Sequence, residues 1–429
     1  MTTPLNIGIA GLGTVGAGVV RLLNDNAALV TRRAGRVIRV VAVSARDRTR
    51  DRGIDLAGAD WVDAPEQLAH HTGVDVVVEL IGGAEGPAKA LAAASIAAKR
   101  PFITANKAML AAHGMALARA AEAASVPLKY EAAVAGGLPV IKGLREGAAA
   151  NRITQISGIL NGTCNYILST MEATGREFAD VLAEAQHLGY AEADPSFDID
   201  GIDAAHKLSI LACLAFGTRI DCAAVSTNGI RAVDACDIAQ ANALGFCIRL
   251  IGQAAYDAGG LYQAVRPMLV PLDHPLAHVK GAINAVTVDA DPVGQLQFEG
   301  PGAGAGPTAS AVVADLIDLA RGSNGAPFGM PVAALEAAAP ADPGARIARS
   351  YVRFAVEDKP GVLAEITAAM RDCAVSIETL IQRGEAPGGG VLVVMTTHEG
   401  PEGAVARALA QLGQSSALTS PPLVLPILG

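Results

Sequence analysis

Residues 5–23 read LNIGIAGLGTVGAGVVRLL and decide the fold of the first part of the chain. Leu5–Ala10 is a continuous apolar run that predicts a buried strand, and the glycines of GLGTVG lead directly into a helix through residues 19–23. In this setting the first glycine makes the turn, the second lets a pyrophosphate approach the backbone, and the third packs helix on strand. The helix N-terminus attracts the phosphates. We therefore expect a dinucleotide to bind at Gly11, Gly13, Thr14, Val15 and Gly16; a glycine-rich turn without a ligand is the alternative.

The second strand, expected at Arg39–Ser44, indicates which dinucleotide is bound. It ends without the acidic residue that commonly holds a ribose 2′-hydroxyl, and arginines follow at positions 46, 48 and 50. We expect Arg46 to meet a 2′-phosphate, which favours NADP, although the nearby Asp47 leaves NAD open. The interval from Gly11 to this strand end exceeds the usual spacing of about 20 residues, which an extended first helix would explain.

Further strands are expected at Val74–Leu80 and Phe102–Thr104, with a helix at residues 87–99 between them. The second of these strands runs into TANKA, residues 104–108, and doubly wound sheets bind ligands at the carboxyl ends of their strands. Asn106 and Lys107 are therefore candidate cofactor contacts, and Lys107 is also a candidate catalytic group. A solvated lysine at a helix start is an equally weighted alternative.

A third region of interest follows the helix expected at residues 111–124 and the strand expected at 128–134. Residues 131–143 read EAAVAGGLPVIKG, a shaped loop whose carbonyls and single carboxylate suit a small hard cation. A plain turn is the alternative. The next strand, expected at Arg152–Ile159, leads into hydroxyl and amide side chains around Asn161 and Thr163 that suit a polar substrate.

The densest group of charges lies in residues 187–208, HLGYAEADPSFDIDGIDAAHKL. Pro195 ends any incoming helix, and the apolar run after residue 207 predicts a new helix with Asp203 near its first turn, at the positive end of the helix dipole. Asp203 and Lys207 are four residues apart, so they lie on one helix face and can pair. A lysine beside a fixed acid, behind an acidic loop, suits a ligand with an ammonium group. The alternative is a solvated loop that caps an ordinary helix.

The last third of the chain contains a glycine-rich loop, a boundary and a small domain. Residues 298–310 read FEGPGAGAGPTAS, and Gly304 within them is expected to cover the cofactor as the chain returns into a helix. Residues 321–346 are rich in Gly, Pro and Ala, as in a linker. The remainder has the strand and helix order βαββαβ of the ferredoxin-like plan. We expect a dinucleotide-binding domain at 1–140 to which the helix at 305–321 returns, a substrate and dimerisation domain at 141–320, a linker at 321–348 and a regulatory domain at 349–429.

Composition limits the classes of function. The chain has 429 residues, 51% of them hydrophobic, and 47 glycines, which indicates an α/β protein of two or three domains. Its net charge of −9 offers no basic surface for nucleic acid or an anionic membrane. The six cysteines form no metal-binding or disulfide pattern, and no signal or membrane-spanning segment is recognisable, so we expect a cytoplasmic protein that acts on small molecules.

Together these motifs resemble those of the homoserine dehydrogenases, in order and across about residues 5–320. The segments that carry the resemblance are GLGTVGAGV (11–19), VVVELIGG (76–83), TANKA (104–108), GILNGTCNYI (158–167), GYAEADPSFDIDGIDAAHKL (189–208) and GPGAGAGPTASAVV (300–313). The tail, with DKPGVLAEI at residues 358–366, resembles an ACT domain, a small amino-acid-sensing module. The implied architecture is a Rossmann-type domain, an α+β catalytic domain and a ferredoxin-like ACT domain.

The resemblance implies reversible NAD(P)-linked reduction of L-aspartate 4-semialdehyde to L-homoserine, toward threonine and methionine. Hydride transfer leaves negative charge on the aldehyde oxygen, so a proton donor or cation is needed there. By match to the family, Lys207 carries the proton, Asp203 orients it, and Lys107 lies between cofactor and substrate. The sequence leaves open which lysine gives the proton.

The remaining roles also rest on the resemblance. Glu192 would pair with the substrate ammonium, and Thr163 and Tyr190 would line the same pocket. A monovalent cation, typically sodium, would be held by the carbonyls of the loop that contains Glu131, Val134, Gly136 and Leu138. Threonine is the expected effector, at the loop of residues 358–361, in a homodimer or homotetramer.

Two other functions stay open. The first is a different NAD(P)-dependent oxidoreductase of an amino acid or semialdehyde, which would share the glycine loop but not the acidic segment. The second is a non-catalytic sensor that binds a dinucleotide and an amino acid without turnover. The presence of both lysines and of the acidic segment argues against each of them.

Overall fold

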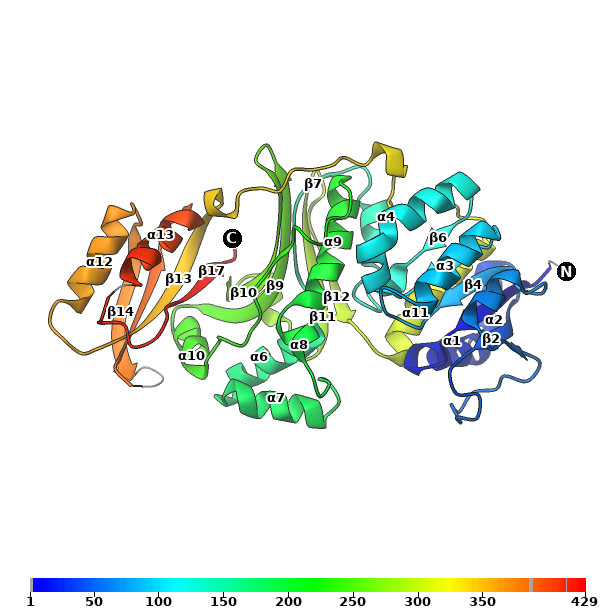
Figure 1. Cartoon of the computed structure of the whole chain (residues 1–429), viewed down its shortest axis with the longest axis horizontal. Coiled ribbons are helices and arrows are strands. Elements are labelled where there is room, and N and C mark those ends of the chain that lie inside the picture. Colours follow the sequence, from blue (N-terminus) through cyan, green and yellow to red (C-terminus); the bar gives the residue numbers. More distant parts are fainter. Residues whose placement is uncertain (1–2, 386–388, 414) are drawn as a thin grey trace. The chain divides into compact units, whose positions relative to one another are not determined.

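The computed structural model describes residues 3–385, 389–413 and 415–429. By its internal contacts the chain forms two compact units, each made of three segments. The first unit comprises Met1–Leu160, Asp203–Val225 and Ile283–Ala338, and the second comprises Asn161–Ile202, Ser226–Ala282 and Ala339–Gly429. Most of their helices and several of their strands are labelled in Figure 1. No helix of the described segments is both long and apolar enough to cross a membrane.

The first unit contains a six-stranded parallel sheet in the order β3-β2-β1-β4-β5-β6. Its strands are β1 (Leu5–Ala10), β2 (Ile38–Ser44), β3 (Asp60–Trp61), β4 (Val76–Glu79), β5 (Phe102–Thr104) and β6 (Leu128–Lys129). The helices of this region are α1 (Thr14–Asp25), α2 (Ala27–Ala34), α3 (Pro87–Ala97) and α4 (Lys107–Ala124). The doubly wound fold predicted from the glycine-rich turn is confirmed, and β1 has the predicted bounds.

Helix α11 (Ala305–Ala320) belongs to this sheet although it lies far along the chain. Its Val312 and Leu316 are fully buried in the same apolar cluster as Ile7 and Ile9 of β1. The helix also packs closely on α1, because a Cβ at Gly18 would lie 2.6 Å from the carbonyl oxygen of Ala305. The N-terminus of α11 is thereby placed beside the first turn of the sheet.

Two local expectations were wrong. The long interval after Gly11 is not one extended helix, because Asn26 leaves helical geometry between α1 and α2. The strand expected at residues 128–134 ends at Lys129 and is followed by a 3₁₀ turn, Glu131–Ala133. The reason is that the Glu131 amide donates to the Asp315 carboxylate, so it is taken out of any strand ladder.

The rest of the first unit is an antiparallel group of three strands and a buried helix. The strands are β7 (Arg152–Ile159), β11 (Ile283–Asp291) and β12 (Gly294–Pro301), with β11 in the middle. The helix is α9 (Ile202–Phe216), in which most side chains are buried. Short helical turns, α5 (Val140–Lys142) and a π-helical Gly143–Gly147, precede β7.

The second unit begins with helices α6 (Gly162–Thr174), α7 (Phe178–His187) and α8 (Ser196–Ile199). The long hairpin β9 (Phe246–Asp257) and β10 (Gly260–Pro271) follows α10 (Ala235–Ala243), and the short β8 (Ser226–Thr227) pairs with β10. The hairpin is almost entirely buried along its length except at its tip, so it forms the apolar framework of this unit.

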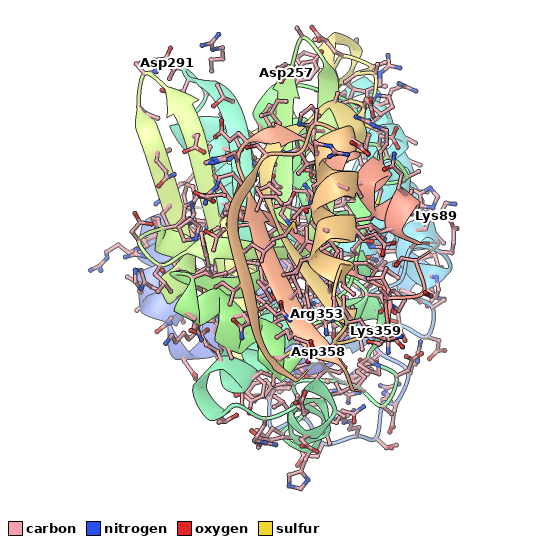
Figure 2. The ribbon with its side chains drawn as sticks, turned by 90° about the vertical axis from the view of Figure 1, so that its left-hand side faces the viewer. Lys89, Asp257, Asp291, Arg353, Asp358 and Lys359 are labelled. Carbon is pink, nitrogen blue, oxygen red and sulfur yellow. The ribbon has the colours of Figure 1, made fainter. Side chains whose placement is uncertain are left out.

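The tail of the second unit has the predicted βαββαβ order. Its elements are β13 (Ile347–Val356), α12 (Val362–Asp372), β14 (Ile377–Glu385), β15 (Val391–Thr397), α13 (Glu402–Leu412) and β17 (Leu423–Ile427). The strands lie in the order β17-β13-β15-β14, each antiparallel to its neighbour, which is the ferredoxin-like arrangement. The short β16 (Gly400–Pro401) pairs with the start of β13. Figure 2 shows this face, with Asp358 and Lys359 in the loop between β13 and α12.

Candidate active site

The glycine-rich turn has the geometry that a pyrophosphate needs. Gly11 has φ +95, and a Cβ there would lie 2.5 Å from the Leu80 carbonyl oxygen; a Cβ at Gly16 would lie 2.0 Å from the Gly11 carbonyl oxygen. Gly13, by contrast, has nothing within 4 Å of its Cβ position. It is also the N-cap of α1, whose first turn has neither a capping side chain nor an acidic residue. The open space and the positive end of the helix dipole together suit an anion.

The arginines after β2 are arranged around Trp61 of β3. The guanidinium carbons of Arg48 and Arg52 lie 5.5 and 5.7 Å from the centre of the Trp61 ring. Arg52 also donates from Nε to the Leu12 carbonyl at 3.0 Å, which ties this loop to the glycine-rich turn. Arg46, the predicted phosphate contact, lies in the same loop and is exposed. The sequence analysis did not single out Arg52, because Arg52 lies farther from Gly11 along the chain than the residue that usually contacts the ribose in this fold.

Lys107 is positioned by a network at the carboxyl ends of β4 and β5. Asn106 caps α4 by accepting from the Met109 amide at 3.0 Å, and its own amide donates to the Gly83 carbonyl at 2.7 Å. Thr104 donates to the fully buried Glu79 carboxylate at 2.5 Å. Lys107 is thus the first residue of a helix whose start is fixed from both strands.

Asp203 joins the two candidate lysines. Its Oδ1 lies 2.8 Å from the Lys107 ammonium and its Oδ2 lies 2.8 Å from the Lys207 ammonium. Lys207 also donates to the Leu160 carbonyl at 2.7 Å, and Asn284 donates to the same carbonyl at 2.9 Å. The structure therefore contains the predicted pair within α9 and adds Lys107 to it.

The environment of this group keeps Asp203 ionised. Asp203 is 3% exposed and Lys207 is 8% exposed. Burial opposes ionisation of Asp203, but the two lysines outweigh it and hold the pKa of this carboxyl well below its usual range. A carboxylate fixed between two ammonium groups can orient a lysine toward a reacting oxygen.

A second group of predicted residues lies in the second unit and is organised by Asp198 of α8. Thr163 donates to the Tyr190 carbonyl at 2.7 Å and lies 3.4 Å from the Asp198 carboxylate. The Asn161 amide donates to Asp198 at 2.8 Å, while its oxygen caps α6 by accepting from the Cys164 amide at 2.8 Å. Sequence reasoning noted the acid and the amide but did not predict that they would meet.

Glu192 and Tyr190 are more exposed than Thr163. The Tyr190 ring packs on the Tyr166 ring with 4.7 Å between centroids, and 46% of Tyr190 is exposed. Glu192 is exposed; its carbonyl accepts from the Gln186 amide at 3.0 Å, and its carboxylate has no partner among the residues described here. A carboxylate held by its backbone and open to solvent is available to an ammonium group.

The loop expected to hold a cation contains backbone carbonyl groups that accept no backbone hydrogen bond, and buried acidic side chains lie nearby. Outside regular elements of the described chain, no backbone amide donates to the carbonyls of Val134 or Gly136. Glu131 is buried and accepts from the Ile141 and Lys142 amides at 3.1 and 3.0 Å. Burial, together with the nearby Asp315 carboxylate, raises the pKa of Glu131 to about 8. Carbonyl oxygens next to acidic groups fit a small hard cation; Leu138 follows in the same turn and is buried.

Most of the chain matches models of known protein families. Residues 11–131 match the family model described as the NAD-binding domain of homoserine dehydrogenase, and residues 139–317 match the one described as homoserine dehydrogenase. Residues 350–414 match the ACT domain.

Individual relatives agree with these matches. The chain is 45% identical over 415 residues to a homoserine dehydrogenase of Neisseria gonorrhoeae, with 95% of each chain covered, and 42% identical over 427 residues to one of Pseudomonas aeruginosa, with 97% of each covered. A crystal structure of a homoserine dehydrogenase from Thiobacillus denitrificans superimposes with a TM-score of 0.94 at 41% identity, covering 99% of this chain and 98% of that one. A hyperthermophilic archaeal homoserine dehydrogenase, solved with NADPH, has a TM-score of 0.63 at 26% identity and covers 74% of this chain and 97% of its own.

Proposed function

Because the chain belongs to the homoserine dehydrogenases, which are NAD(P)-dependent oxidoreductases, we propose that it interconverts L-aspartate 4-semialdehyde and L-homoserine on the route to threonine and methionine. The observation that carries the proposal is the position of Asp203 between the ammonium groups of Lys107 and Lys207. This arrangement places two charged donors beside one fixed acid, as reduction of a carbonyl requires.

The proposed chemistry assigns a separate task to each member of this group. When bound, the nicotinamide coenzyme supplies the hydride that reaches the aldehyde carbon. The aldehyde oxygen then needs one proton, and Lys207 supplies it; in the reverse direction Lys207 accepts the proton of the homoserine hydroxyl. Asp203 holds the Lys207 side chain in place. Lys107, which begins α4, stabilises the developing negative charge on the oxygen from the coenzyme side.

A separate role in substrate recognition is proposed for Glu192, Thr163 and Tyr190. Glu192 pairs with the α-ammonium group, and Thr163 and Tyr190 line the pocket. The bonds from Thr163 to the Tyr190 carbonyl and to Asp198 support this role, because they fix the hydroxyl before the substrate arrives.

A monovalent cation is proposed at the loop of residues 131–138, held by the carbonyls of Glu131, Val134, Gly136 and Leu138. The open carbonyls of Val134 and Gly136 and the buried carboxylates nearby support it. Its charge would offset the buried acids and stabilise the turn between β6 and α5. Sodium suits such a set of oxygen ligands.

NADP is the proposed coenzyme. The loop after β2 presents Arg46, Arg48 and Arg52 with no acid at the strand end, and a 2′-phosphate would bind there. The glycine-rich turn and Gly304, the N-cap of α11, would enclose the pyrophosphate. Threonine is the proposed effector of the ACT domain, at the loop of residues 358–361.

The experiment that tests this function is the initial rate of homoserine oxidation with NADP and with NAD, each with and without threonine. We expect a higher rate with NADP and a reduction by threonine. Arg46→Ala should lower kcat/KM for NADP by about tenfold and leave the NAD rate unchanged, since a charged hydrogen bond contributes about 1.5 kcal/mol or more. Arg119→Ala, an exposed arginine of α4, is the matched control. No oxidation with either coenzyme would contradict the proposal.

A further inference from the structure

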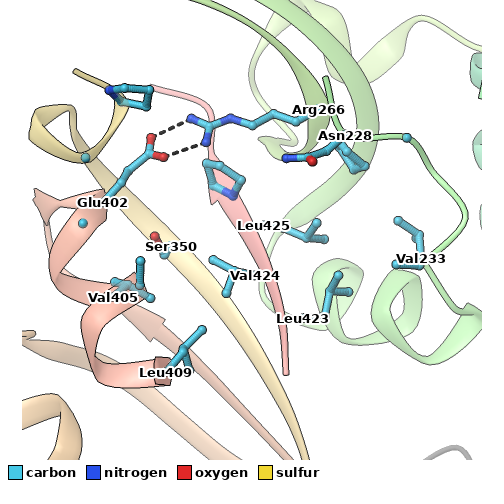
Figure 3. Close-up of a pocket in the computed structure, with 18 of the residues that line it drawn as sticks. Asn228, Val233, Arg266, Ser350, Glu402, Val405, Leu409, Leu423, Val424 and Leu425 are labelled. Carbon is cyan, nitrogen blue, oxygen red and sulfur yellow. Dashed lines mark hydrogen bonds and ion pairs between the residues drawn. The ribbon is translucent and has the colours of Figure 1, made fainter. Parts of the chain in front are cut away.

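Buried polar groups without an assigned role are found in both units. In the second unit they line a cavity of about 800 Å³, and Figure 3 shows Arg266 paired with Glu402 at its edge. Arg231 and Asp200, which also line it, pair with each other, so the lining has no net charge to select a ligand. In the first unit the group is the amide of Asn284, near the start of β11, and it lies beside the residues of the proposed reaction.

Asn284 shares a backbone oxygen with the proposed proton carrier. Its amide nitrogen donates to the Leu160 carbonyl at 2.9 Å, and the Lys207 ammonium donates to the same oxygen at 2.7 Å. Leu160 directly follows β7, the strand that pairs with β11. A carbonyl oxygen has two lone pairs, so these two donors occupy it and fix the direction of the carbonyl.

The direction of this carbonyl matters because it orients the Lys207 ammonium. That group carries three N–H bonds. One is directed to the Asp203 carboxylate, at 2.8 Å, and one to the Leu160 carbonyl. Once two of the three directions are set, the third is set as well, and it must be aligned with a reacting oxygen for proton transfer. Asn284 is neutral, so it acts on Lys207 by geometry and not by charge.

The hydrogen-bonding of Asn284 is incomplete. The residue is 1% exposed, and its Oδ1 has no hydrogen-bond partner among the described residues. A buried acceptor without a partner costs free energy. The contribution of this amide therefore lies in its donor, the bond to the Leu160 carbonyl.

Asn284 also contacts the glycine-rich loop that is expected to cover the coenzyme. A Cβ at Gly302 would lie 2.2 Å from Cγ, 2.3 Å from Oδ1 and 2.4 Å from Nδ2 of Asn284, so the loop backbone packs directly on the amide. Gly302 is itself packed against the loop proposed to hold a cation, since a Cβ at Gly136 would lie 2.4 Å from the Gly302 carbonyl oxygen. The glycine-rich loop cannot shift toward Asn284 without moving the amide that holds Leu160.

We propose that Asn284 is a positioning residue of the reaction. It holds the Leu160 carbonyl that orients Lys207, and its contact with Gly302 keeps this orientation in register with the loop of residues 300–304. The inference rests on the proposed function, in which Lys207 carries the proton, but the placement of Lys207 can also be measured without turnover.

The first test is Asn284→Ala, which removes the donor. We expect kcat for homoserine oxidation to fall by about tenfold, the effect of losing one well-placed hydrogen bond, while KM stays within twofold because the residues proposed to bind the substrate are unchanged. Thr287→Val is the matched control: Thr287 is also 1% exposed in β11, and it donates to the Ser157 carbonyl of β7 at 3.0 Å. Its kcat should stay within twofold of the wild type. A rise in KM at constant kcat, or an equal fall in kcat in both variants, would overturn the proposal.

The second test measures the placement of Lys207 directly. The full-length protein is labelled with a small amine reagent, and mass spectrometry compares Lys207 with the exposed Lys89. Labelling of Lys207 should rise at least threefold in Asn284→Ala and stay unchanged in Thr287→Val. If the wild type oxidises no homoserine and this rise is still observed, the proposed function fails and the placement of Lys207 by Asn284 stands. Unchanged labelling in Asn284→Ala would overturn the proposal.

The third test approaches Asn284 from the loop. Gly302→Ala places a methyl group on the amide and should lower kcat by a factor similar to that of Asn284→Ala; because it keeps Asn284, it also tests the proposal should Asn284→Ala fail to fold. The three atoms nearest to the added Cβ all belong to Asn284, so the double variant should be no slower than Asn284→Ala alone. Losses that multiply to about a hundredfold in the double variant would show that the two residues act independently and would overturn the coupling to the loop.

Discussion

The two groups of candidate site residues are built in opposite ways. In the first unit Asp203 and Lys207 are buried, and the Asp203 carboxylate forms an ion pair with the Lys207 ammonium at 2.8 Å. In the second unit Glu192 and Tyr190 are exposed, and backbone bonds hold them in place. Charges in a buried site interact strongly, so separating them costs much free energy. Exposed charges are screened by water and interact weakly. This difference agrees with the roles proposed above, chemistry for the first group and substrate recognition for the second.

The largest effect is expected for Lys207→Ala, which tests whether the buried group carries out the chemistry. We expect kcat to fall by roughly 10²–10⁴-fold, the usual contribution of a positioned proton donor, while the Kd for the coenzyme stays unchanged. Steady-state rates and coenzyme fluorescence titration measure the two quantities. Lys89→Ala, at an exposed lysine paired with Glu85, is the matched control. An unchanged kcat in the Lys207 variant would remove this residue from the chemistry.

Asp203→Asn tests the same group through stability. Because the folded-state pKa of Asp203 lies below its value in the unfolded chain, the carboxylate stabilises the fold above about pH 4, and this contribution is lost as the pH falls through the folded pKa. The variant should lower the free energy of unfolding by about 3 kcal/mol at neutral pH, since a buried ion pair loses its acid. Urea midpoints at pH 7, at pH 4 and well below pH 4 measure this: the difference between variant and wild type should be nearly the same at pH 7 and pH 4 and should shrink only below the unfolded-state pKa of about 4. Asp273→Asn, at an exposed acid, should show no such difference.

Thr163→Val tests the proposed role of the second group in substrate binding. The change keeps the shape of the side chain and removes the bonds to the Tyr190 carbonyl and to Asp198. We expect KM for homoserine to rise by about tenfold, the equivalent of roughly 1.4 kcal/mol, with kcat reduced less than in the lysine variant. Thr170→Val, within the same helix, is the control. A fall in kcat at constant KM would place Thr163 with the catalytic group instead.

The two groups also differ in how far the sequence could predict them. Asp203 and Lys207 lie four residues apart in one helix, so helical periodicity alone brings them together. The contact of Lys107 with Asp203 joins two helices distant in the chain, and no local pattern encodes it. The same holds for the Leu160 carbonyl, because a backbone oxygen carries no residue signature.

The fold shows the same division. The strand β1 was predicted with its observed bounds because apolar residues and a glycine turn delimit it locally. The strand β6 was predicted too long, because Asp315, on a helix far along the chain, captures the Glu131 amide. Local patterns thus predict elements and their order, while tertiary hydrogen bonds decide where elements end and which side chains meet.

The smallest expected effect belongs to Glu192→Gln. Because the carboxylate is exposed, its pairing with the substrate ammonium is screened, and such pairs contribute about 0.2–1 kcal/mol. We expect KM for homoserine to rise by about threefold, with kcat unchanged, and the effect to weaken at high salt. Initial rates at low and high ionic strength measure it, and Glu66→Gln in the first unit is the control. A rise of a hundredfold would mean that the loop closes around Glu192 when homoserine binds and removes its carboxylate from water, so that the ion pair is no longer screened.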